Sequence, residues 1–443
     1  MIQNRAEFPD SAGHQTALDC VEAGIEASHP EQIVRRSVSL EGTTLTVEGE
    51  SHDLTTYERV IVLGGGKAAA QVARTLEAIL GPHLNGGVVV TDSPCETAVV
   101  DVRPADHPIP SQRGVESTRA LLERAARCDS ETLVLAVITG GASACLVAPA
   151  ADISLDDLRA TTQALLDGGV PIGAVNAVRK HLSAVKGGRL AGSLAPARVC
   201  SLVMSDVVGD DPSVIGSGPL VADGTTYGDA RAVIDDNDIT VPAAVRERLT
   251  AGTNGGHEET PDTGDPVFER VTTHIIGSNM SAIAAARATA VERGYNALVL
   301  STRLRGRARD AALAHVAVAE EIAATGNPVE PPAVVLSGGE TTVRVTGGGT
   351  GGPNHEFALA AAMDLPPEAV LAAVDTDGID GATDAAGALV DSTVVTDRGA
   401  ARQALDENNS HPYLADCDAV IRTGPTGTNV NDLRVLVVDT PDD

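Results

Sequence analysis

The chain repeatedly alternates valine- and isoleucine-rich runs with helical segments, and a glycine turn often joins the two. ERVIVLGGGKAAAQVARTLEAIL (58–80) reads as a strand, a glycine turn and a helix, and ETLVLAVITGG (131–141) is a further strand that ends in glycine. Strands that alternate with helices predict parallel sheets covered by helices. An aromatic content of only 2% fits a core of Ala, Val, Leu and Ile. The sequence therefore predicts an α/β fold.

A second series of strands and helices follows a segment without apolar periodicity. This segment, AGTNGGHEETPDTGDP (251–266), is rich in Gly, Pro and acidic residues and is the expected linker. We expect one α/β domain over 1–250 and a smaller one over 267–443, with a ligand-binding cleft between them. Residues 14–30 predict a first helix, and residues 38–50 predict an antiparallel hairpin.

The charge is strongly acidic. The chain carries 61 acidic and 32 basic residues, for a formal net charge of −29, which disfavours broad electrostatic binding to DNA, RNA or anionic lipid. Only three residues are lysine: Lys67, Lys180 and Lys186. This composition is typical of a protein adapted to a high-salt cytosol, where screening removes self-repulsion. All three lysines fall in glycine-rich motifs, so they mark positions where arginine cannot substitute, or else they are chance survivors of a codon bias.

The sequence also indicates a cytoplasmic location. Its six cysteines are scattered without a CxxC pair, as expected in a reducing compartment, and MIQNRAEFPD does not read as a signal peptide. The uncharged stretch 132–151 is long enough to span a bilayer, but its glycines and Pro149 favour a strand, a glycine turn and a helix start. We therefore expect no membrane partner.

Two glycine motifs in the first half suggest anion binding. In Gly64-Gly65-Gly66-Lys67 and Gly140-Gly141-Ala142-Ser143, glycine lets backbone N–H groups approach a phosphate or carboxylate at a helix start. Lys67 adds a positive charge and Ser143 a hydroxyl. The alternative interpretation is tight packing of a helix on a strand. The first motif also loosely fits the dinucleotide pattern G-x-G-x-x-A.

Two further motifs follow in the same half. VRKHLSAVKGGRLA predicts a helix broken near Gly187, with Lys186 better placed than Lys180 to reach a ligand. Lys180, together with Arg179 and His181, either lines the cleft or pairs with acidic neighbours. Asp206 directly follows a buried-looking strand, where a carboxylate is well placed to hold Mg²⁺ or accept a substrate proton.

The second half contains loops rich in Gly, Thr, Asn and Asp. Such loops suit phosphate and ribose oxygens and a magnesium ion. They are LSGGE (Gly338, Gly339, Glu340), NHEF (Asn354, Glu356), DTDGIDG (with Asp380) and TGPTGTNVND (with Asn431). A calcium loop is the competing interpretation of DTDGIDGATDAAG, which lacks the terminal glutamate of an EF-hand.

Taken in order, these motifs resemble the glycerate 2-kinase family over nearly the whole chain. The resemblance rests on GGGKA, GGASA, KHLSAVKGG, SDVVGDDPSVIGSGP, LSGGETTV, NHEFAL, TDGIDG and TGPTGTNVNDLRV. It implies a Rossmann-like N-terminal domain, a smaller C-terminal MOFRL domain and an active site in the cleft between them. It also implies transfer of phosphate from ATP to the 2-hydroxyl of D-glycerate with Mg²⁺, giving 2-phosphoglycerate and ADP, by a monomer or a homodimer.

The resemblance assigns roles to individual residues. It implies Lys67 and Asp206 as catalytic residues, and Asp206 and Asp380 as metal ligands. Substrate or nucleotide binding would fall to Gly65, Gly66, Gly141, Ser143, Lys186, Gly338, Gly339, Glu340, Asn354, Glu356 and Asn431.

The chain departs from the family pattern at two places. The usual Gly-Gly-Arg-Asn-Gln-Glu is Gly-Gly-Pro353-Asn354-His355-Glu356 here, so an arginine that would face phosphate is missing. The usual Glu-Gly-Glu-Ala-Arg is Arg305-Gly306-Arg307-Ala308-Arg309, whose extra arginines are candidates to compensate.

Two other functions stay open at this point. The first is an NAD(P)H-dependent hydroxypyruvate reductase that uses the first glycine loop for the dinucleotide, with His107 or His181 as the acid. The second is a non-catalytic sensor of a sugar acid or nucleotide.

Overall fold

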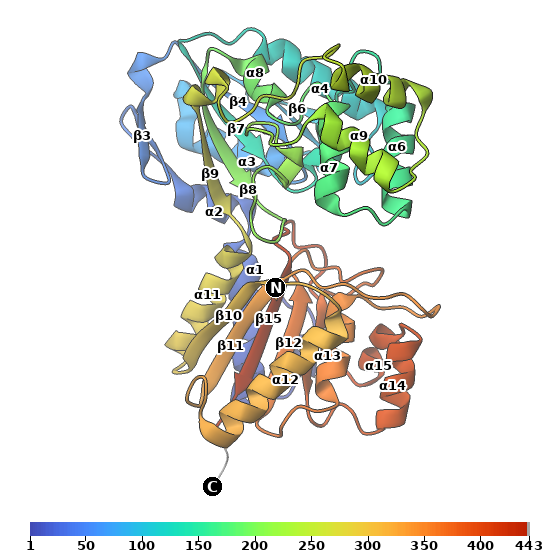
Figure 1. Cartoon of the computed structure of the whole chain (residues 1–443). Helices are drawn as coiled ribbons and strands as arrows, with labels where there is room; N and C mark the ends of the chain where they lie inside the picture. Colours follow the sequence, from blue (N-terminus) through green and yellow to red (C-terminus); the bar gives the residue numbers. More distant parts are fainter. Residues whose placement is uncertain (441–443) are drawn as a thin grey trace. The chain divides into compact units, whose positions relative to one another are not determined.

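The computed structural model describes residues 1–440, and the chain divides into two compact units. The central unit comprises residues 34–276, and the terminal unit combines residues 1–33 with 277–443 (Figure 1). This division differs from the expected boundaries, because the first helix packs with the C-terminal half. The expected linker 251–266 belongs to the central unit, where the Glu259 carboxylate accepts from Tyr227 N and Thr260 Oγ1 donates to Asp223.

The central unit opens with a small antiparallel sheet and continues as an α/β layer. Its small sheet contains β1 (Val38–Glu41), β2 (Thr44–Val47) and β3 (Glu50–Asp53). The larger sheet contains β4 (Arg59–Gly65), β5 (Gly87–Thr91), β6 (Val100–Pro104), β7 (Thr132–Ile138), β8 (Arg198–Met204) and β9 (Val271–Gly277). The helices are α2 (Pro30–Ser37), α3 (Ala69–Leu80), α4 (Gln112–Ala125), α5 (Ala142–Cys145), α6 (Leu155–Asp167), α7 (Ile172–His181), α8 (Arg189–Leu194), α9 (Tyr227–Asp236) and α10 (Ala243–Thr253).

The larger sheet confirms the predicted Rossmann-like topology. Its order is β6-β5-β4-β7-β8-β9, and the pairs β5–β6, β4–β5, β4–β7 and β7–β8 are parallel. The chain moves outward in one direction from β4 to β6 and then returns to the other side of β4 with β7. Ligands of such sheets bind where this reversal occurs, outside the carboxyl ends of the two central strands. In this unit the reversal lies between β4 and β7.

The terminal unit is a mixed sheet covered by helices on both faces. Its strands are β10 (Asn296–Leu304), β11 (Ala333–Gly339), β12 (Ala369–Asp375), β13 (Gly387–Asp391), β14 (Val420–Ile421) and β15 (Asp432–Val438). Its helices are α1 (Ala12–Ala27), α11 (Asn279–Glu292), α12 (Ala308–Thr325), α13 (Pro353–Ala362), α14 (Arg398–Asp406) and α15 (Ser410–Asp416). One apolar cluster joins the sheet to α1 and α11, and a second joins the opposite face to α12 and α13.

The expectation of a parallel sheet is wrong for most of this unit. Among the described residues of this unit, up to 440, only the pair β10–β11 is parallel, because β15 inserts between β11 and β12 and runs antiparallel to both. A strand buried on both faces shows a continuous apolar run in either orientation, so the pattern did not reveal the reversal. The insertion places Asp432, the first residue of β15, beside Gly339 and Asp375, which end the neighbouring strands.

Several local features follow directly from neighbouring residues. Ser154 caps α6 in a capping box with Asp157, and Gly168 is its C-cap. Residues 38–50 form the expected hairpin, to which β3 is added. The stretch 132–151 is a strand, a turn and a short helix, and no helix within residues 1–440 is long and apolar enough to cross a membrane. The helix expected around Lys186 is instead interrupted earlier, since α7 ends at His181.

Candidate active site

Both glycine motifs of the central unit lie at the reversal of strand order. Gly65 ends β4 and Ile138 ends the adjacent β7, so the two loops that follow emerge side by side. Asp206 follows β8, the next strand in the sheet. The Rossmann-like topology therefore gathers Lys67, Ser143 and Asp206 at one edge of one sheet.

The backbone N–H groups of the first glycine loop are used within the protein. Gly66 N donates to Val90 O (3.0 Å), Lys67 N to Gly140 O (2.8 Å) and Ala68 N to Thr139 Oγ1 (3.2 Å). A Cβ on Gly64 would lie 1.9 Å from Val137 O. Gly64, Gly65 and Gly66 thus serve close packing of neighbouring strands, which was the alternative interpretation of this motif. The side chain of Lys67 is what the loop offers to a ligand.

The second glycine loop is held in place by a buried lysine. Lys186 Nζ donates to Ser143 O (2.8 Å) and lies 3.5 Å from Gly216 O, and its side chain is only 3% exposed. Burial, together with the positive charge of Arg179, lowers the pKa of Lys186 to about 7. Ser143 Oγ lies 3.0 Å from Ser217 Oγ, so the expected hydroxyl donor is already part of a hydrogen-bond chain.

Lys67 and Asp206 form the electrostatic centre of this edge. Gly141 has φ +78°, and a Cβ there would lie 3.0 Å from Lys67 Cγ and 3.1 Å from His107 Cδ2, so the three residues are neighbours. Burial raises the pKa of Asp206, while Lys67 and the Gly141 N–H oppose the shift. Burial and the charge of Lys67 lower the pKa of His107. A carboxyl group with a raised pKa beside a lysine can accept a proton from a hydroxyl and then share its charge with the ammonium.

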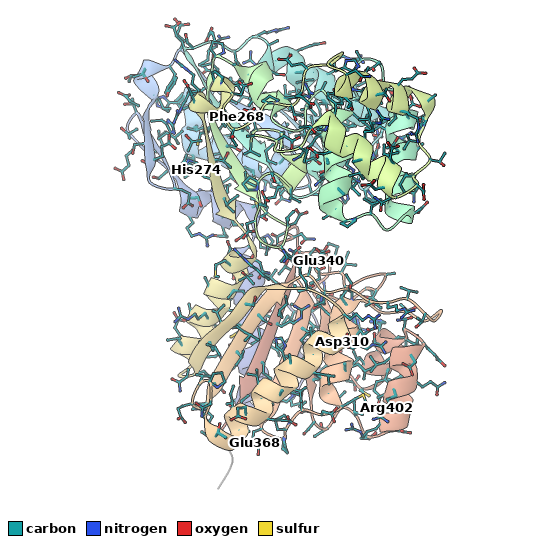
Figure 2. All side chains as sticks on the ribbon, viewed as in Figure 1. Phe268, His274, Asp310, Glu340, Glu368 and Arg402 are labelled. Carbon is teal, nitrogen blue, oxygen red and sulfur yellow. The ribbon has the colours of Figure 1, made fainter. Side chains whose placement is uncertain are left out.

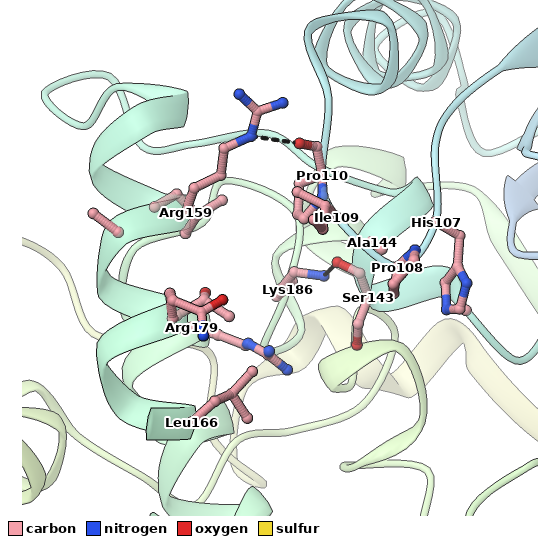
Figure 3. Close-up of a pocket in the computed structure, with 15 residues that line it drawn as sticks. His107, Pro108, Ile109, Pro110, Ser143, Ala144, Arg159, Leu166, Arg179 and Lys186 are labelled. Carbon is pink, nitrogen blue, oxygen red and sulfur yellow. Dashed lines mark hydrogen bonds between the residues drawn. The ribbon is translucent and has the colours of Figure 1, made fainter. Parts of the chain in front are cut away.

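A pocket of about 670 Å³ opens beside this centre (Figure 3). Helix α6 forms one wall and the segment His107–Pro110 another, with Ser143 and Lys186 between them. Arg159, Arg179 and Lys186 all line the pocket, which makes it cationic in a protein of net charge −29. Such a local reversal of charge favours an anionic ligand.

The second-half motifs meet at one edge of the terminal sheet. Gly338 and Gly339 end β11, and Asn431 precedes β15. Asn354 Nδ2 donates to Asp432 Oδ1 (2.7 Å), and Thr341 N donates to Asp432 Oδ2 (3.2 Å). The structure thus gathers the asparagines and glycines predicted for this half around Asp432.

Asp380 is engaged at the start of α13, and its role as a metal ligand stays a prediction. Its carboxylate accepts from Asn354 N (3.0 Å) and His355 N (2.8 Å) at the start of α13, and it also contacts His355 Nδ1. Both oxygens therefore act as a cap for the helix. Asp206 is the better candidate for a metal ligand, because within the described residues 1–440 no side-chain hydrogen bond or ion pair engages its carboxylate. Within residues 1–440, no group of three or more His, Cys, Asp or Glu side chains is arranged to hold a metal ion.

The two predicted glutamates are placed very differently. Glu356 is buried and pairs with Arg309 Nε (3.0 Å) from the variant Arg-Gly-Arg-Ala-Arg segment. Glu340 is exposed where β11 ends (Figure 2). Arg309, which matches the arginine of the family pattern, therefore serves a structural ion pair, and the extra arginines Arg305 and Arg307 are exposed.

Known proteins match the chain along nearly its whole length. Residues 16–250 match a domain family of unknown function, DUF4147, and residues 333–432 match the MOFRL family. The chain is 38% identical to the glycerate 2-kinase of Pyrococcus horikoshii, covering 96% of this chain and 97% of the relative. It is 36% identical to the D-glycerate 2-kinase of Thermotoga maritima, covering 97% and 100%. The chain belongs to the glycerate 2-kinase family.

The solved glycerate kinase of Thermotoga maritima agrees with this membership. It superposes with a TM-score of 0.85 at 34% identity, covering 96% of this chain and 99% of that one. A relative from Agrobacterium vitis, 39% identical over 86% of this chain and 87% of its own, carries the provisional name of a hydroxypyruvate reductase.

The motif analysis missed several residues of this glycerate 2-kinase family member. Arg159 lines the pocket but stands in ordinary helical sequence, so nothing local marked it. Asn279 Nδ2 donates to Val430 O and Asp432 O (both 2.8 Å), although it starts a helix far away in sequence. His107 was considered only for the reductase, yet it lies beside Lys67. The place of Asn279 at the start of α11, directly after the N-cap Ser278, was the one available signal among these.

Proposed function

We propose that the protein transfers the γ-phosphoryl group of ATP to the 2-hydroxyl of D-glycerate, giving 2-phosphoglycerate and ADP. The observation that carries the proposal is the near full-length likeness to two named glycerate 2-kinases. The cationic pocket beside Lys67 supports it independently, because a phosphoryl-transfer site must neutralise negative charge on both substrates.

Phosphoryl transfer needs positioning and charge neutralisation more than covalent chemistry. We assign Lys67 to the transferring phosphoryl group, whose charge its otherwise unengaged ammonium would offset. The 2-hydroxyl oxygen forms the new bond to phosphorus, the bond to the bridging oxygen of ADP breaks, and the hydroxyl proton passes to Asp206. The raised pKa of Asp206 suits this acceptor role.

Magnesium fits at the same edge. The free lone pairs of Asp206 would hold the ion, which supplies positive charge to the phosphate oxygens when bound. Lys67 then shares the charge neutralisation and orients the phosphate. We further propose a cytoplasmic enzyme, monomeric or dimeric, whose partners are these two small molecules.

A product assay tests the proposal. ADP formation is followed with ATP, Mg²⁺ and D-glycerate, and phosphorus NMR identifies the product. We expect 2-phosphoglycerate as the first product. A 3-phosphoglycerate signal appearing first, or no ADP, contradicts it.

The same sample tests the hydroxypyruvate reductase, which the provisional name of the Agrobacterium vitis relative favours. Absorbance at 340 nm with NAD(P)H and hydroxypyruvate measures that activity. We expect none, because the first glycine loop has no N–H free for a pyrophosphate at Gly66, Lys67 or Ala68. Nor is His181 free to act as the acid, since it lies between Ala177 O (2.7 Å) and Glu259 (3.2 Å).

A further inference from the structure

The pocket of the central unit is much larger than the acid substrate requires. Its volume of about 670 Å³ lies within the range of sites that enclose drug-sized ligands, roughly 300–1,000 Å³. A three-carbon acid would leave most of that space as water against apolar walls. The volume therefore points to a ligand of larger size.

The outer part of the pocket is apolar. Ile109 and Leu166 both line it, and they are 64% and 50% exposed, whereas most large apolar side chains of this chain are buried. Leu158, Pro108 and Pro110 continue the same lining. Flat apolar walls of this kind suit a planar ring system and give a carboxylate nothing to bind.

The inner part carries positive charge with unused capacity. Within the described residues 1–440, the guanidinium of Arg179 has no hydrogen-bond or ion-pair partner, although it is half-buried. Figure 3 shows Arg179 and Lys186 reaching the pocket from different segments on the side where Ser143 lies. Arg159, by contrast, is already engaged, since its Nε donates to Pro110 O (2.6 Å). Arg179 is thus the cation best placed to receive an anionic group.

The cationic part of the pocket lies next to Lys67, which we assign to the transferring phosphoryl group. Gly141 and His107 line the pocket and also lie next to Lys67. A ligand with a ring at the apolar part and a chain of anionic groups would therefore extend past Arg179 and Lys186 toward Lys67. Adenosine with its phosphates has this division of chemistry.

We infer that this pocket binds ATP, with adenine and ribose between Ile109 and Leu166 and the phosphates passing Arg179 toward Lys67. The inference rests on the proposed function, because it takes ATP as the phosphoryl donor. It assigns D-glycerate to the far side of Lys67, near Asp206, and makes the pocket the determinant of nucleotide affinity. It also makes Arg179 a phosphate-binding residue.

Two substitutions separate the two parts of the pocket. Leu166→Asn removes apolar contact with the ring, so the dissociation constants of adenosine and ADP should both rise about tenfold. Arg179→Gln removes a charged donor, so the constant for ADP should rise roughly tenfold while that for adenosine changes less than about twofold. Ile172→Asn is the matched control, because Ile172 is 55% exposed in the same unit and does not line the pocket.

The measurements are calorimetric titrations of the full chain with ADP and with adenosine, and KM values for ATP and D-glycerate. Leu166→Met should keep wild-type affinity, which separates loss of contact from misfolding. In both pocket variants we expect a raised KM for ATP and an unchanged KM for D-glycerate.

Two outcomes overturn the inference. One is an unchanged ADP constant in Leu166→Asn, as in the control. The other is a raised KM for D-glycerate with unchanged ADP binding, which would assign the pocket to the acid. A wild-type protein that binds ADP in this pocket but does not phosphorylate D-glycerate refutes the proposed function and leaves the pocket assignment standing.

Discussion

Removing the charge of Lys67 should abolish most activity at little structural cost. The backbone N–H of Lys67 holds the loop through Gly140 O, and that bond survives any side-chain change. In the part of the chain that the structure describes, the Lys67 ammonium makes no hydrogen bond or ion pair. Lys67→Gln should therefore change the free energy of unfolding by less than about 1 kcal/mol.

The catalytic loss should be far larger. An electrostatic donor that acts on the transition state is worth about 10²–10³ in kcat, or about 2.7–4 kcal/mol. Lys67→Arg should restore little of the lost activity, because the space around the side chain is narrow. Lys67 Cγ lies only 3.0 Å from the point where a Cβ on Gly141 would be, and His107 is close by. A planar guanidinium is wider than an ammonium and does not fit the same space.

The pH profile gives an independent measurement. Lys67 opposes the burial that raises the pKa of Asp206, so removing its charge raises that pKa further. The acid limb of kcat should consequently move to higher pH in Lys67→Gln. Arg74→Gln is the control, since it removes one charge from an exposed position on α3.

The assay is steady-state ADP formation in high salt, with circular dichroism to verify folding. Wild-type turnover in Lys67→Arg, or a loss below about tenfold in Lys67→Gln, would refute the reasoning. The phosphate-binding role would then pass to Arg179, which lines the same pocket.

Three other predictions concern stability. Thermal midpoints should rise clearly between about 0.1 M and 2 M KCl, since screening relieves the repulsion of a −29 charge; equal midpoints would exclude a high-salt adaptation. Burial lowers the pKa of His315 to about 4 from 6.5, so as the pH falls this side chain is protonated in the unfolded chain before it is protonated in the folded chain. The free energy of unfolding should therefore fall as the pH drops from 6.5 toward 4. Urea titrations should show a shallower fall with pH in His315→Gln, and the same dependence on pH in both proteins would contradict this. Asp223→Asn leaves the buried Lys180 without its carboxylate partner at 3.0 Å and should lower the free energy of unfolding by about 3–5 kcal/mol, measured by urea unfolding. Arg231→Gln breaks the exposed ion pair with Asp235 and should lower it by less than about 1 kcal/mol. Equal losses of stability in the two variants would refute the reasoning.

Local chemistry made much of the fold predictable. The capping box of α6 follows from Ser154 and Asp157 alone, because it needs only neighbours in sequence. The parallel order around β4 follows from alternating strands and helices. The antiparallel β15 was not predictable, since its partners are chosen by the return path of a distant loop. The placement of α1 in the terminal unit has the same cause, as its apolar face gives no indication of which sheet it covers.

The candidate site was predictable where a loop follows a strand. Lys67, Ser143 and Asp206 were found because strand ends converge on one edge of a parallel sheet. Arg159 was not, because a lone arginine in a helix carries no local sign of facing a pocket. The contacts of Asp380 with the start of α13 were not predictable, because a carboxylate that caps a distant helix looks the same in sequence as one that binds metal.

The chain uses arginine at nearly all its basic positions, and its three lysines need an explanation that differs from one position to the next. Lys180 and Lys186 are buried, with one carboxylate and two carbonyls near their ammonium groups. A guanidinium has five donors, and these sites would leave several of them unpaired, each at a cost of about 1–3 kcal/mol. The buried Arg434, with Nε and Nη1 unpartnered within residues 1–440, shows this difficulty, which stacking on Phe357 offsets. Retention of lysine is therefore explained by packing at two of the three positions. Only Lys67, half-buried and without a partner for its ammonium, is left for which a ligand is the better explanation.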